Sequence, residues 1–212
     1  MRFQVVFFLT ASVCLAVSSG DWSGEIRTDP MTDEQMVMMS TYNTADLLDA
    51  FFFGSAVPEF FLVFNEGDDS PLIGVDFNKY IGFGGRESTC LIRIDDAPAQ
   101  EYPVVIDNSS QMIGIYIGED THVREFYADL LRGGQFLIRF TPAGQAQVTT
   151  EFSLSGITAV SRELGIDVDY YLNLGIPNPA SSVAPSGEAY SPITRMPSLS
   201  TESLQLLREN AR

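Results

Sequence analysis

The chain has few of the side chains that carry out chemistry at protein sites. Its 212 residues include one histidine (His122), two cysteines and one lysine (Lys79). Zinc sites normally use one or more imidazole ligands, so a single histidine argues against a zinc enzyme. The sequence also has no Gly-x-Ser-x-Gly elbow, no His-Glu-x-x-His pair and no glycine-rich phosphate loop that leads into a helix. We therefore expect no catalytic residues, no metal site and no cofactor.

The chain has too few cysteines to stabilise its fold with disulfide bonds. Cys14 lies in an N-terminal apolar run, and if that run is removed Cys90 remains alone, which excludes an internal disulfide. Cys90 itself lies among apolar residues, where a thiol behaves as a small hydrophobe. A reactive thiol needs an electropositive, partly open setting and a nearby base, and nothing local links Cys90 to His122. Packing must supply the stability.

Basic residues are also few, with 12 against 28 acidic ones and a net charge of −16. This charge repels phosphate backbones and anionic membrane surfaces, so we expect no nucleic-acid partner and no nucleotide. A cationic partner or divalent ions suit it better. The alternative is that the excess acid only keeps the protein soluble.

The N-terminus predicts a secretory signal peptide over residues 1–20. Arg2 precedes the apolar run 3–17, and the small residues 18–20 follow it. We expect cleavage near Gly20 or Asp21 and a periplasmic or secreted protein, touching the membrane only if this segment stays uncleaved as an anchor. Outside the cytoplasm there is no ATP pool and no reducing buffer, so binding, assembly and simple hydrolysis remain as functions.

The rest of the chain predicts a mainly β fold, an antiparallel β-sandwich-like domain over residues 21–175. Short β-type runs alternate with turns at regular spacing, which is typical of a sandwich or meander. The expected strands are 22–27, 35–42, 60–64, 72–77, 88–94, 102–106, 112–117, 136–141 and 148–154.

Two short helices are expected within this domain, at 121–131 and 156–164. In the first, apolar residues recur at helical spacing, Thr121 can cap the start, and Gly133 with Gly134 can end it in a left-handed turn. Residues 46–53 fit either a helix turn or a strand. Residues 176–198 are rich in Pro and Ser and predict a disordered linker, followed by a short amphipathic helix at 199–212.

Two arginines within apolar strands are the most specific local pattern. Arg93 is followed two residues later by Asp95, and Arg139 repeats the situation in another strand. Arginines in strands usually have a carboxylate partner. We therefore name Arg93, Asp95 and Arg139 as candidate binding residues of a recognition patch; the alternative is an ion pair within the sheet.

Paired acids keep two other functions open. A hydrolase of envelope glycans or peptides could use carboxylates such as Asp95 and Asp96, provided two acids lie about 5–10 Å apart. A calcium-dependent binding module could use the loop acids near Asp68 or the pair Asp167 and Asp169, although neither has the spacing of a defined calcium loop.

Several segments resemble the type VI secretion-associated VasI/TagO family of exported bacterial proteins. The resemblance covers about residues 22–164 and rests on Trp22, the loop 29–33 (DPMTD), the strand 60–64, 73–80 (IGVDFNKY), 93–96 (RIDD), 130–132, 136–140 and 151–157 (EFSLSGI). It implies a small periplasmic accessory domain without assigned catalytic activity, which supports secretion-apparatus assembly or envelope attachment by binding a protein partner of the envelope. The cysteine pair of the family pattern is replaced here by Phe64 and residues 164–166.

Overall fold

The computed structural model describes residues 15–28, 32–43 and 57–174. Ten strands form one sheet in this part, and every neighbouring pair is antiparallel. The prediction of a mainly antiparallel β fold is therefore confirmed. Four predicted segments lie wholly or mostly outside the described residues: the signal peptide, 46–53, 176–198 and 199–212.

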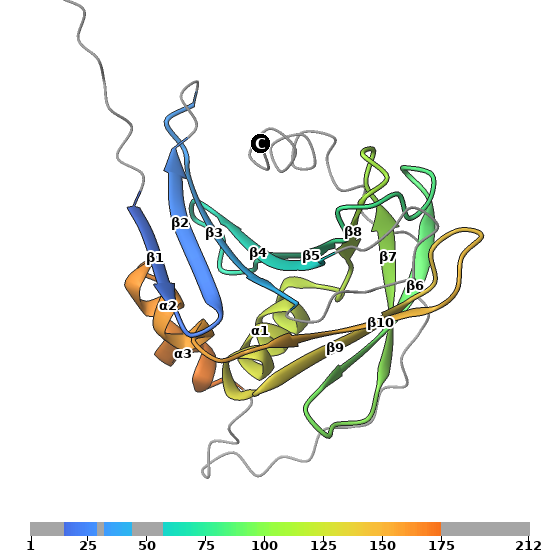
Figure 1. Ribbon diagram of the computed structural model, residues 1–212. Helices are drawn as coiled ribbons and strands as arrows, with labels where there is room; N and C mark the ends of the chain where they lie inside the picture. Colours follow the sequence, from blue (N-terminus) through green and yellow to red (C-terminus); the bar gives the residue numbers. More distant parts are fainter. Residues whose placement is uncertain (1–14, 29–31, 44–56, 175–212) are drawn as a thin grey trace, which may run out of the picture.

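The strand order is β1-β2-β3-β4-β5-β8-β7-β6-β9-β10. The first five strands form a meander. Strands β6, β7 and β8 form a second meander, of which β8 pairs with β5, and α1 carries the chain from β8 to β9 (Figure 1). The strands are β1 (Leu15–Ser19), β2 (Trp22–Thr28), β3 (Gln35–Tyr42), β4 (Glu59–Asn65), β5 (Leu72–Asp76), β6 (Glu87–Ile94), β7 (Gln100–Ile106), β8 (Met112–Ile115), β9 (Gln135–Phe140) and β10 (Val148–Ser153).

All nine predicted strands are present, with ends that agree within two residues. Alternation of apolar and polar residues located them because successive side chains of a strand point to opposite faces. The additional strand is β1, which lies in the segment predicted as the end of the signal peptide. It forms one edge of the sheet and pairs with β2 through all five of its residues.

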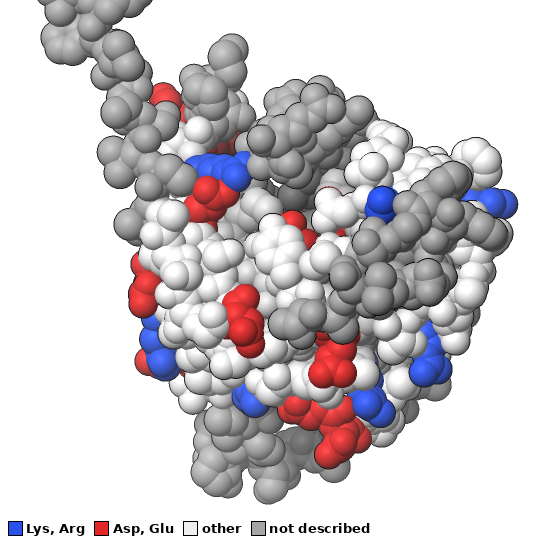
Figure 2. All heavy atoms as spheres, viewed as in Figure 1, with Lys and Arg blue, Asp and Glu red and all other residues white. Residues whose placement is uncertain are grey.

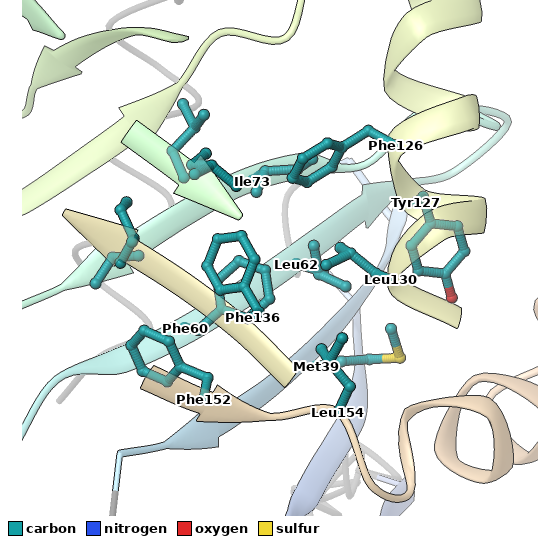
Figure 3. Close-up of a cluster of buried hydrophobic side chains, with 14 of the residues drawn as sticks. Met39, Phe60, Leu62, Ile73, Phe126, Tyr127, Leu130, Phe136, Phe152 and Leu154 are labelled. Carbon is teal, nitrogen blue, oxygen red and sulfur yellow. The ribbon is translucent and has the colours of Figure 1, made fainter. Parts of the chain in front are cut away.

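The sheet curls so that its two halves face each other, which produces the sandwich-like packing. Phe60 of β4 stacks on Phe136 of β9 with ring centroids 4.3 Å apart, although four strands separate β4 from β9 in the sheet order. Phe152 of β10 lies 5.6 Å from the same Phe60 ring. Figure 3 shows these rings meeting at the centre of the core.

Three short helices accompany the sheet: α1 (Asp120–Arg132), α2 (Ile157–Glu163) and α3 (Val168–Leu172). The third was not predicted. Helix α1 lies within the curve of the sheet (Figure 1), where Tyr127 contacts Phe64 of β4 and Phe126 contacts Phe136 of β9. In the part of the chain that is described, no helix combines the length and apolar character needed to cross a membrane.

Both predicted caps of α1 are wrong. The helix begins before Thr121, and its N-cap residue, Glu119, makes no side-chain capping bond. At the other end Gly133 is extended, with φ −77° and ψ 163°, rather than left-handed. Its requirement for glycine is steric, because a Cβ there would approach Ile94 Cγ2 to 2.7 Å.

Candidate functional site

The structure brings two of the three predicted binding residues onto one exposed face. Strands β6 and β9 are neighbours, with Arg93 opposite Leu137 and Leu91 opposite Arg139. Both arginines are exposed, Leu91 is 36% exposed, and Arg139 Nε donates to Thr149 Oγ1 at 3.1 Å. We call this surface the arginine face and define it by Leu91, Arg93, Leu137 and Arg139.

Asp95 does not join the arginine face. It follows β6 in a left-handed turn with φ 48°, and its carboxylate accepts hydrogen bonds from the backbone N–H groups of Gly134 and Gln135, both at 2.9 Å. It thus ties the end of β6 to the corner between α1 and β9. The alternative, an ion pair between Arg93 and Asp95, does not form, although both residues lie in the described part of the chain.

A second group of polar side chains crosses three strands, β3, β4 and β5, on the side of the sheet that faces away from the main core. Tyr42 of β3 is opposite Glu59 of β4, Glu59 is opposite Asp76 of β5, and Asp76 is opposite Met112 of β8. Directly opposed residues have Cβ atoms about 4.5–5.5 Å apart. Two carboxylates therefore lie side by side in this row.

Glu59 and Asp76 line a groove of about 460 Å³. The groove extends from this row across β3 and β2 to β1, and Glu25 forms an ion pair with Arg27 along it. We call it the acidic groove. Its lining residues are Ala16, Val17, Ser23, Gly24, Glu25, Arg27, Met38, Ser40, Tyr42, Glu59, Asp76 and Asn78.

The electrostatic setting of Asp76 favours its protonated form. Burial raises the pKa of Asp76 to about 6, and the charges of Glu59 and Asp107 add to this, while the backbone N–H of Asn78, which donates to Asp76 Oδ1 at 2.6 Å, opposes it. The pKa of Tyr42 is also raised, first by burial and then by Glu59. A proton thus binds Asp76 more readily than it binds an ordinary aspartate.

This pair has the elements of proton-transfer chemistry. Two adjacent carboxylates, one of which holds its proton to near pH 6, can act as acid and base toward the same bound molecule. Other acids are spread over the surface. Figure 2 shows acidic side chains in several separate groups over the visible face, with basic side chains between them.

The acids considered for calcium are engaged with protein groups. The Asp167 side chain caps α3 by accepting a hydrogen bond from the backbone N–H of Tyr170. Asp169 forms an ion pair with Arg162 at 2.9 Å. Asp69, next to Asp68, pairs with an arginine of α1 at 2.5 Å. Over residues 15–28, 32–43 and 57–174, no group of three or more His, Cys, Asp and Glu side chains is arranged to hold a metal ion.

Cys90 and His122 differ in their exposure to solvent. Cys90 is 2% exposed, and burial raises its pKa to about 12, so the thiol stays protonated. His122 is exposed in the first turn of α1.

Sequence reasoning missed the acidic groove because its acids look unremarkable in the chain. Glu59 follows a proline at the start of an apolar run, and Asp76 ends another run 17 residues later. Only the pairing of β4 with β5 makes them neighbours. The one usable signal was that each is an acid at a strand end.

Comparisons with known proteins leave the chain without an assigned relative. No protein-family model, no curated protein and no solved structure matches it.

Proposed function

We propose that this chain is an exported, non-enzymatic accessory protein of the cell envelope that binds a protein partner through the arginine face. Support of an assembled apparatus such as a type VI secretion system, or attachment to the envelope, is the role that the VasI/TagO resemblance suggests. The observation that carries the proposal is the juxtaposition of Arg93 and Arg139 with two apolar side chains on neighbouring strands.

The composition of this surface favours protein recognition. Arginine is enriched at protein interfaces, where its planar guanidinium binds carboxylates in bidentate fashion and its stem packs on apolar groups. Leu91 and Leu137 are partly accessible beside the two arginines. On the flanking strands Glu101 lies opposite Leu91 and Glu151 lies opposite Leu137, so the arginine face carries charges of both signs.

A crosslinking experiment in the source organism tests this proposal. A photoreactive amino acid at Leu91 should crosslink one discrete envelope protein, and the charge reversals Arg93→Glu and Arg139→Glu should abolish the product. Tyr170, an exposed residue of α3, is the matched control position and should give no such product. A product that is unaffected by both charge reversals would refute the role of the arginine face.

A hydrolase is the second candidate, and the pair Glu59 and Asp76 is the observation that favours it. Two acids in one groove, one of them partly desolvated, are typical of glycan-cleaving and peptide-cleaving sites. Activity of the purified protein on envelope glycans or peptides that is lost in Asp76→Asn and Glu59→Gln, but kept in Asp96→Asn, would establish it. Activity that is retained in all three variants, or found in none, would count against it.

A further inference from the structure

Strand β1 pairs with the outer edge of β2. We call the surface that β1 covers, formed by β2 and α2, the seat of β1. Leu15 to Ser19 pair with Ile26 to Trp22 of β2, and on its other side β1 pairs with no described strand. The proposed signal cleavage near Gly20 would remove β1 and leave the N–H and C=O groups along that edge of β2 unpaired.

The wall of the seat is formed by β2 and α2. Val17 lies directly opposite Gly24 of β2 and packs against the main core. A Cβ on Gly24 would come within 2.5 Å of Leu164 and 3.0 Å of Val160, so α2 packs closely on β2 at the residue that faces Val17. The seat therefore has a specific place for one apolar side chain.

The end of the seat is held by contacts that do not involve β1. The backbone N–H of Asp21 donates to Ser155 O at 3.0 Å, and Trp22 Nε1 donates to Ser153 O at 2.9 Å. Trp22 is 1% exposed. Because these residues remain after cleavage, β2 is expected to keep its place with an open edge.

We propose that this edge of β2 is a strand-acceptor site for another polypeptide. In the unprocessed chain β1 fills it; after residues 1–20 are removed, an extended segment of a partner protein adds antiparallel to β2, with an apolar residue opposite Gly24. Strand addition of this kind gains affinity from main-chain hydrogen bonds and specificity from alternate side chains. The seating of β1, with the uncharged sequence LAVSS, shows which pattern fits. The inference rests on the proposed export and cleavage.

The first measurement is the N-terminus of the exported protein, by intact mass. A protein that begins near Gly20 or Asp21 satisfies the premise, whereas one that retains residues 15–19 fills its own edge and overturns the proposal. The processed protein is then titrated with a capped peptide of residues 15–20, LAVSSG, and followed by hydrogen exchange of the β2 amides and by the fluorescence of Trp22, the one tryptophan of the chain.

We expect the peptide to slow exchange along β2 and to raise the melting temperature. The peptide with Val17→Asp should bind at least tenfold more weakly, because a charged group would enter the apolar place opposite Gly24. Equal binding of the two peptides, or no change in β2 exchange, would overturn the acceptor site. So would a stable homodimer whose β2 amides are already protected. None of these results depends on Arg93 or Arg139, so failure here and failure of the arginine face are distinguishable.

Discussion

Replacing Asp76 by Asn should stabilise the protein at neutral pH and leave its stability at pH 4 nearly unchanged. Burial holds the pKa of Asp76 at about 6 in the folded protein, against an ordinary value of 3.8. The folded state therefore binds a proton more tightly than the unfolded state does. Stability contributed by this group is complete below about pH 4 and is lost as the pH rises through about 6.

The magnitude follows from the difference between these two pKa values. A difference of about 2 corresponds to about 3 kcal/mol at most, since each pKa unit is worth about 1.4 kcal/mol. The side chain is partly exposed, so solvent screening should reduce the effect to roughly 1–2 kcal/mol. The Asn78 N–H can still donate to the amide oxygen of the variant. For a domain of this size we expect a rise in melting temperature of roughly 3–6 °C at pH 7.5.

Thermal unfolding of both proteins from pH 4 to pH 8 checks this prediction. Glu59→Gln is the matched control: it removes a charge that raises the pKa of Asp76 but leaves the burial, which is the larger cause. It should therefore keep most of the wild-type pH dependence. A lower melting temperature for Asp76→Asn at pH 7.5, or an equal shift at both ends of the pH range, would refute the reasoning.

Three further predictions concern packing. Phe60→Ala should lower the free energy of unfolding by about 3–5 kcal/mol, because the ring is fully buried and stacks on Phe136; a loss below 1 kcal/mol in denaturant unfolding would contradict this. Cys90 should resist thiol reagents at pH 8 until the protein unfolds, because burial raises its pKa to about 12; rapid labelling of native protein would show otherwise. Gly156→Ala should lower the melting temperature more in the unprocessed chain than in the processed one, because a Cβ would lie 1.8 Å from Ser19 O; equal losses would argue against the docking of β1.

The strands and α1 could be predicted from sequence because their signals are local. The run Gln35–Tyr42 was predicted with its observed bounds, and α1 within one residue at each end. Helix α3 was missed because five residues make too short a periodic pattern. Strand β1 was missed because an apolar run before small residues is typical of an export signal, and its pairing with β2 depends on a partner elsewhere in the chain.

The candidate sites also depend partly on local sequence patterns and partly on strand pairing. Alternation within β6 or β9 places each arginine on a strand face, but only the insertion of β9 beside β6 puts Arg93 and Arg139 together. Asp95 looked like a member of that patch, yet its turn directs the carboxylate to two backbone amides.

The amino-acid sequence alone determined the class of fold, because the period of its apolar residues sets which backbone form can bury them, and it determined the acidic character of the surface. The curled sheet decided everything that depends on distance: the stacking of Phe60 on Phe136, the pairing of Glu59 with Asp76, and the burial that raises the pKa of Asp76. Burial and Coulomb interactions act through space, and separation along the chain carries no information about them until the strands have paired.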